Sequence, residues 1–182
     1  MILLGLSRAG KTSVGRLLSE RLGCSFYDTD ELIRIRTGLT PRELYRQSGV
    51  SALHAAEAAV LRECRGLDFA AGANCAVIAA GGGICDNAEA SAIIATIPLR
   101  VFLYASEAAL FERLTHDALQ TGYYPAFLHF LPVDQKAEAQ RLFTELYTRR
   151  TEWYRKSCNL IIDTTGLDCA AVAEKIAEQS DN

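Results

Sequence analysis

The sequence predicts an α/β fold, in which a doubly wound parallel sheet of about five strands is flanked by helices. Three observations lead to this prediction. Short, uninterrupted apolar runs recur along the chain, a pattern typical of strands buried on both faces. Segments with helical periodicity separate these runs, and strands that alternate with helices form parallel sheets. Finally, 182 residues are the length of one domain, so residues 1–182 are expected to form a single domain.

The first quarter of the chain contains two expected strands and one expected helix. Ile2–Leu4 is a short apolar run closed by Gly5, which indicates a buried strand. Residues 11–22 carry valine and leucine at helical spacing, and Gly23 then supplies a stop signal, so a helix is expected there. Ser25–Tyr27 is a second short apolar run and a second expected strand.

The next elements are marked by capping signals. Thr40-Pro41-Arg42-Glu43 is a capping box with proline at the first helical position, which predicts a helix start. Ser51 is expected to cap a further helix. One face of that helix would carry His54, Glu57 and Leu61. The apolar run Ala76–Ala80, followed by three glycines, is the next expected strand.

The second half of the chain is expected to contain a lid. Arg100–Tyr104 is a strand candidate, and Ser106 is expected to cap a helix that ends at Leu114. Residues 115–133 lose helical periodicity and contain two prolines but no lysine or arginine, which predicts a mobile lid. The remaining elements are expected to be a helix at 135–156, a strand at 160–162 and a helix at 168–178.

Composition excludes several classes of protein. The 19 basic and 22 acidic residues give a net charge of −3, which argues against binding to nucleic acid. Apolar runs are too short for a membrane span, and no secretory leader is expected at the N-terminus. The six cysteines lack a CxxC pair and are expected to be thiols in a reducing compartment. We therefore expect a cytoplasmic monomer.

A phosphate-binding motif lies between the first strand and the first helix. The segment from Gly5 to Thr12 fits G-x-x-x-x-G-K-[ST], in which backbone N–H groups and a helix N-terminus surround phosphates. Lys11 would reach the β- and γ-phosphates, and the Thr12 hydroxyl would bind Mg²⁺. The motif predicts a nucleoside triphosphate site made by Gly5, Ser7, Arg8, Ala9, Gly10, Lys11, Thr12 and Ser13.

Two carboxylates follow the second expected strand. Asp28 and Asp30 would lie at the carboxyl edge of the sheet beside the phosphate loop, where ligands of open α/β sheets bind. One of them can reach the shell of a magnesium ion while the other faces a neighbouring hydroxyl. The alternative is a solvated acidic turn that caps the next helix.

Taken together, these motifs resemble those of shikimate kinases, which are small kinases of the P-loop fold. The resemblance rests on the phosphate loop, on Phe26–Ile33 with its two aspartates, and on Val77–Gly83 with its triple glycine. It continues to Phe111–Leu114 and to Arg150–Tyr154. It implies a P-loop kinase fold and ATP-dependent phosphorylation of a small hydroxylated carboxylic acid, with Mg²⁺ as cofactor.

The same resemblance implies roles for individual residues. Asp28 would hold Mg²⁺ through water, and Asp30 would bind the acceptor hydroxyls and accept a proton. Arg113 would stack on adenine. The acceptor would be bound by Asp30, His54, Gly81, Gly82 and Arg150.

The chain departs from the family pattern at three positions. The family has G-E-x-x-F-R-x-x-E where this chain has Gly49 to Glu57, so His54 replaces an arginine of the carboxylate clamp. His54 either donates conditionally to the acceptor carboxylate or is a half-buried helix residue. A lid arginine before proline is replaced by Tyr124. Arg8 replaces a glycine of the loop, and it either brings the missing charge to the phosphates, as a catalytic group, or is exposed to water.

The sequence thus favours shikimate as the acceptor but leaves two alternatives open. The first is a kinase of the same fold with another acceptor, such as homoserine, because one arm of the carboxylate clamp has changed. The second is a non-catalytic regulator that binds nucleotide. The intact Lys11, Thr12, Asp28 and Asp30 argue against the regulator.

Overall fold

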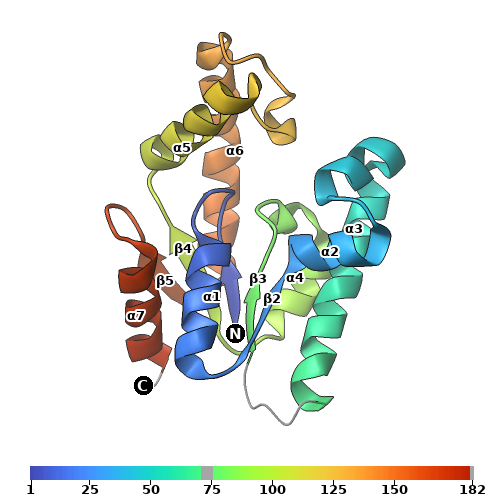
Figure 1. Ribbon diagram of the computed structural model, residues 1–182, viewed down its shortest axis with the longest axis vertical. Helices are drawn as coiled ribbons and strands as arrows, with labels where there is room; N and C mark the ends of the chain where they lie inside the picture. The colour runs from blue at the N-terminus through green and yellow to red at the C-terminus, as the bar shows by residue number, and fades with distance from the viewer. Residues whose placement is uncertain (71–75, 181–182) are drawn as a thin grey trace.

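The fold is a five-stranded parallel sheet covered by helices (Figure 1). The computed structural model describes residues 1–70 and 76–180. The strands have the spatial order β2-β3-β1-β4-β5, and every neighbouring pair is parallel. Their bounds are β1 (Ile2–Leu4), β2 (Ser25–Asp28), β3 (Ala76–Ala79), β4 (Arg100–Tyr104) and β5 (Leu160–Asp163). The predicted doubly wound α/β architecture is therefore confirmed.

Seven α-helices are found in the described part of the chain. They are α1 (Lys11–Leu22), α2 (Thr29–Thr37), α3 (Pro41–Ala70), α4 (Ala88–Ala95), α5 (Glu107–Thr121), α6 (Lys136–Ser157) and α7 (Cys169–Ser180). Helices α1 and α7 pack side by side on one face of the sheet (Figure 1). The crossover helices α3, α4 and α6 cover the other face, as right-handed connections between parallel strands require.

The predicted cap at Thr40 is present. The Thr40 backbone N–H donates to Glu43 Oε2 at 2.8 Å, and the Glu43 N–H donates to Thr40 Oγ1 at 3.2 Å. The predicted further helix near Ser51 is also present, because non-helical backbone at Gly49 divides α3 into two helical parts and the second begins next to Ser51, although no cap hydrogen bond of Ser51 is found among the described contacts. Helix α3 runs on to Ala70 and is interrupted at Gly49, whose φ of 80° and ψ of 179° kink the backbone. Glycine adopts this conformation without a steric cost.

The segment expected to be an aperiodic lid is partly helical. Helix α5 continues past Leu114 to Thr121, because Leu114 and Ala118 keep one face of the helix buried and Gly122 forms its left-handed C-cap. The prediction that periodicity ends at residue 115 is therefore wrong. Beyond Gly122 the chain forms an antiparallel bridge between Tyr123 and Pro132 and a short 3₁₀ turn.

The tip of this lid segment contacts the start of helix α3. The Phe130 ring centroid lies 4.2 Å from the guanidinium carbon of Arg42, in the first turn of α3. Tyr124, which occupies the place of the family's lid arginine, is 1% exposed, and its ring stacks on Phe111. Tyr124 thus belongs to the core.

The sheet brings distant loops together at its carboxyl edge. Strand β1 is central and completely buried, and it pairs with β3 on one side and β4 on the other. The loops that leave the neighbouring strands β1, β3 and β2 lie at one edge, where the strand order reverses. Among the described residues, no helix is both long enough and apolar enough to cross a membrane.

Candidate active site

An open cleft of about 510 Å³ lies at the carboxyl edge of the sheet, and the phosphate loop forms much of its wall. This loop joins β1 to α1 and turns on Gly5 and Gly10, with φ of 146° and 92°. A side chain at Gly5 would collide with the Leu103 carbonyl oxygen at 2.8 Å. The glycines therefore keep the loop close to the sheet and leave its concave side open to a ligand.

Lys11 begins α1 and lies inside the loop. Its ammonium group donates to the carbonyl oxygens of Gly5 and Leu6, both at 2.8 Å, and the residue is 8% exposed. Burial lowers the pKa of Lys11 to about 8, although the carboxylates of Asp30 and Asp28 favour the charged form. A phosphate bound in the loop would act in the same direction as these carboxylates and would hold the lysine charged.

Thr12 and Asp28 place two oxygen atoms side by side in the cleft. The Thr12 hydroxyl donates to Asp28 Oδ2 at 2.7 Å, and both residues line the cleft. A hydroxyl and a carboxylate are ligands that Mg²⁺ accepts, and in kinases this ion takes its other ligands from phosphates and water. The pair therefore fits Mg²⁺. Asp28 Oδ1 also accepts the Asp30 backbone N–H at 3.0 Å and so caps α2.

Asp30 faces the same cleft from the first turn of α2. Although the residue as a whole is exposed, loss of water around its carboxyl group and the nearby Asp28 charge raise the pKa of Asp30, while Lys11 opposes this shift. A carboxylate with a raised pKa is a better proton acceptor than an ordinary one. The expected solvated turn is only part of the description, because Asp28 caps the helix and Asp30 remains available to a ligand.

The triple glycine after β3 packs tightly against both neighbouring loops. A Cβ atom at Gly81 would lie 2.7 Å from Asp30 Oδ1, and one at Gly82 would lie 2.5 Å from Ser7 Oγ. The Gly81 N–H also donates to the Thr29 hydroxyl at 2.9 Å. This turn therefore fixes the distance between the phosphate loop and the aspartates.

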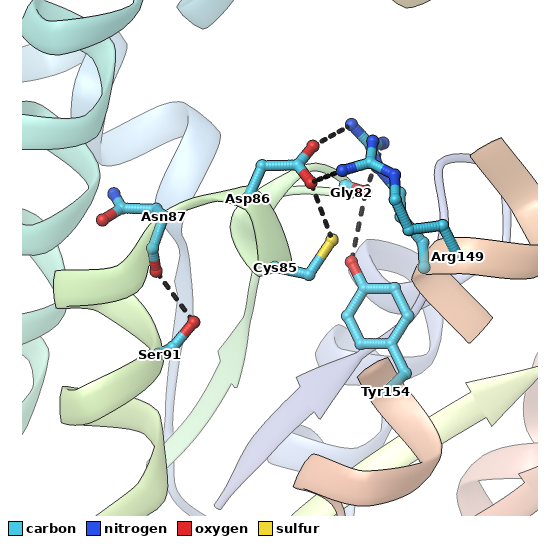
Figure 2. A network of polar contacts seen from close by, with 8 residues as sticks. Gly82, Cys85, Asp86, Asn87, Ser91, Arg149 and Tyr154 are labelled. Carbon is cyan, nitrogen blue, oxygen red and sulfur yellow. Dashed lines mark hydrogen bonds and ion pairs between the residues drawn. The ribbon is translucent and has the colours of Figure 1, made fainter. Parts of the chain in front are cut away.

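Arg150, on α6, forms a hydrogen bond to this glycine turn. Its Nη1 donates to the Gly82 carbonyl oxygen at 2.9 Å, and the Tyr154 hydroxyl donates to the same oxygen at 3.1 Å. Its Nη2 pairs with Asp86 Oδ2 at 2.7 Å, and Asp86 Oδ1 pairs with Arg149 Nη1 at 2.7 Å (Figure 2). One carboxylate therefore joins two guanidinium groups.

His54 belongs to a neighbouring polar group. Asn87 donates through Nδ2 to the His54 carbonyl oxygen at 2.8 Å and to Glu57 Oε2 at 2.9 Å. Burial raises the pKa of Glu57, while the Asn87 hydrogen bond and the nearby His54 oppose this shift, and Asp30 and Asp86 add to it. His54 thus lies next to Asn87, half-buried on α3, but it does not line the cleft.

Arg8 and Arg113 lie together on the wall of the cleft. Arg113, on α5, donates through Nη1 to the Arg8 carbonyl oxygen at 2.8 Å. Arg8 has a φ of 68°, which only a minority of non-glycine residues adopt, and its side chain pairs with Asp117 Oδ2 at 2.6 Å. Both arginines line the cleft, and Arg8 is the more exposed of the two.

Most of the residues expected at the site are brought together. The cleft is lined by Ser7, Arg8, Gly10, Lys11, Thr12, Ser13, Asp28, Asp30, Gly82 and Arg113. The lining does not include the expected residues Gly5, Ala9, His54, Gly81 and Arg150. The sequence did not indicate Asp86, Asn87 or Arg149, although Asn87 caps α4 and its position before an apolar helical segment could have revealed it.

Comparison with known proteins gives a consistent result. The sequence model of the shikimate kinase family matches residues 8–181. A shikimate kinase of Chromobacterium violaceum is 30% identical, over 97% of this chain and 87% of the relative, and one of Thiobacillus denitrificans is 33% identical, over 90% and 80%. The structure of shikimate kinase from Acinetobacter baumannii in complex with shikimate has a TM-score of 0.78 at 25% identity, covering 98% of this chain and 90% of that one.

Proposed function

Because the chain belongs to the shikimate kinase family, we propose that it transfers the γ-phosphoryl group of ATP to a hydroxyl of shikimate, a step in aromatic amino acid biosynthesis. The observation that carries this proposal is that Lys11, Asp28 and Asp30 line the same cleft. We expect the enzyme to act as a cytoplasmic monomer and to require Mg²⁺.

The phosphate loop would bind and orient the nucleotide. Backbone N–H groups of the loop and the N-terminus of α1 would surround the phosphates, and Lys11 would exchange its bonds to the Gly5 and Leu6 carbonyl oxygens for phosphate oxygens. Thr12 and Asp28 would hold Mg²⁺, directly or through water, and the ion would neutralise charge on the β- and γ-phosphates. Arg113 would cover the adenine.

Asp30 would orient the acceptor hydroxyl and take its proton. Phosphoryl transfer demands mainly positioning and charge neutralisation, so a carboxylate beside the nucleophile is sufficient as a proton acceptor. Its close approach to Gly81 limits its distance from the turn that follows β3. Arg150 would pair with the acceptor carboxylate, while Gly81 and Gly82 would present backbone groups to the acceptor.

His54 supports a second candidate, a kinase of the same fold that phosphorylates a smaller hydroxy acid such as homoserine. An arginine offers a permanent planar fork to a carboxylate, whereas histidine offers one or two donors and a charge that depends on pH. The exchange therefore weakens one arm of the clamp for the carboxylate of shikimate.

A coupled assay of ADP release tests the proposal. With ATP, Mg²⁺ and a panel of small hydroxy acids, we expect shikimate to stimulate ADP release and mass spectrometry to detect shikimate 3-phosphate. Lys11→Ala should reduce the rate by ~10²-fold or more, because it removes a preorganised charge. Lys156→Ala is the matched control, since Lys156 is exposed and pairs only with Glu152 among the described contacts. Stimulation by homoserine alone would favour the second candidate, and stimulation by no acid would favour a nucleotide-binding regulator.

A further inference from the structure

The strongest unexplained feature beside the active site is the bridge that Asp86 forms between Arg149 and Arg150 (Figure 2). Arg150 is the residue to which the proposed function assigns the acceptor carboxylate. The guanidinium of Arg150 already pairs with the carboxylate of Asp86, with 2.7 Å between Nη2 and Oδ2. The cluster holds two positive charges and one negative charge, so it has the capacity for one further anion.

The Arg150 guanidinium is held rigidly. Its side chain is only 9% exposed, and a Cβ at Gly83 would meet Nη2 at 3.3 Å. The Phe127 ring lies 5.9 Å away, and Nη1 is fixed by the Gly82 carbonyl oxygen. Nε is buried and has no hydrogen-bond partner. A buried arginine needs a counter-charge, and in the absence of acceptor Asp86 provides it.

Asp86 and Arg149 are more exposed and less enclosed than Arg150. Asp86 ends the short 3₁₀ turn Ile84–Asp86, and its side chain is 30% exposed. Arg149 is 65% exposed and bonds only the other oxygen of Asp86 among the described contacts. Two carboxylates on one guanidinium repel each other, so an arriving acceptor carboxylate favours movement of Asp86 toward Arg149.

We propose that Asp86 is an internal competitor of the acceptor carboxylate, and that Arg149 accepts Asp86 when the acceptor binds Arg150. The proposal rests on the proposed function. Under this proposal Arg150 binds the acceptor. Asp86 and Arg149 are specificity-determining residues, because they set how strongly an acceptor carboxylate must bind Arg150 in order to displace Asp86. An acceptor without a carboxylate cannot displace Asp86 and binds poorly.

Three variants test this exchange by steady-state kinetics and by calorimetric titration with shikimate. Asp86→Asn keeps an oxygen that can accept from Arg150 but removes the competing charge, so the KM for shikimate should fall roughly five- to tenfold, the difference between a charged and a neutral hydrogen bond. Arg149→Gln removes the alternative partner and should raise that KM about two- to fivefold, as the loss of an exposed ion pair allows. In Asp86→Asn/Arg149→Gln, the second change should have no further effect.

The double variant separates exchange from direct contact. If Arg149 bound the acceptor itself, its loss would raise the KM in the Asp86→Asn background as well, and the proposal would be wrong. A higher KM in Asp86→Asn alone would mean that Asp86 only positions Arg150, which also overturns it. Should Asp86→Asn fold poorly, as its melting curve would show, Arg149→Gln still decides, since an unchanged KM contradicts the exchange.

Controls separate this inference from the function on which it rests. Arg141→Gln, on the exposed face of α6 and paired with Glu138 and Glu145, should leave the KM for shikimate unchanged. The KM for ATP should not change in any variant, since neither Asp86 nor Arg149 lines the phosphate cleft. Native enzyme that neither binds nor phosphorylates shikimate would overturn the proposed function. Native turnover with equal KM in all variants would overturn the inference alone.

Discussion

Replacing Gly82 by alanine should disable the enzyme by moving two loops apart. The added Cβ would lie 2.5 Å from Ser7 Oγ and 2.6 Å from the Ser7 backbone nitrogen. The hydroxyl can rotate away, but the backbone nitrogen cannot. Ordinary contact requires a separation near 3.5 Å, so one loop must shift by roughly 1 Å.

The structure also indicates which of the two loops is held in place when the added Cβ forces them apart. The Gly82 carbonyl oxygen accepts from Arg150 and Tyr154 on α6, so the glycine turn is fixed from behind and the phosphate loop must move or these bonds must break. A misplacement of ~1 Å at reacting groups can cost ~10²-fold in rate. We therefore expect kcat/KM for shikimate to fall by about 10²-fold in Gly82→Ala.

A coupled ADP-release assay measures this effect, and circular dichroism monitors the fold. Gly38→Ala is the matched control, because Gly38 has a φ of 73° but no atom within 4 Å of an added Cβ. It should lower the melting temperature through backbone strain without changing kcat/KM by more than about twofold. If Gly82→Ala remained folded with kcat/KM within threefold of native, a fixed spacing between the two loops would not be needed for catalysis.

Three further predictions concern charge in the cleft. Arg8→Gly should lower kcat by ~10³-fold if this arginine replaces the lid cation, while relief of its positive φ keeps the fold intact; a rate within about twofold of native would refute that role. Because the pKa of Lys11 is lowered to about 8, kcat/KM for ATP should fall as the pH rises through about 8. The value of kcat at saturating ATP should persist to higher pH, because bound phosphates favour the charged lysine. Identical pH profiles of the two parameters would contradict this prediction. His54→Arg should lower the KM for shikimate about 10-fold or more, by the value of a charged hydrogen bond, and weaken turnover of homoserine; saturation curves that show neither change would make His54 a scaffold residue.

The nucleotide half of the site could be predicted from the sequence because its signals are local. Helix α1 has the bounds expected from its apolar spacing and from Gly23, and the phosphate loop precedes it directly. Asp28 ends strand β2, which pairs in parallel with β3, and Asp30 comes two residues later, so both had to lie at the edge of the sheet that holds the loop.

The cluster around Asp86 could not be predicted in the same way, because its contacts join residues far apart in the chain. Asp86 meets Arg149 and Arg150 from 63 and 64 positions away. An aspartate in a turn gives no signal of such partners. The end of α5 differs from the prediction for another reason: the glycine and prolines that follow it favour a loop, whereas the buried Leu114 and Ala118 and the left-handed cap at Gly122 extend the helix to Thr121.

The place of β1 in the middle of the sheet has a consequence for how the chain acquires its structure during synthesis. Ile2 leaves the ribosome early, yet it pairs with Ile78 and Arg100. At ~5–20 residues per second, these partners follow after roughly 4–20 s. The three apolar residues of β1 stay unpaired in the nascent chain for that time, and the loop attached to them cannot take its final form sooner. Nucleotide can therefore stabilise the phosphate loop only after β3 and β4 have been made, and it arrives too late to guide the first steps of folding.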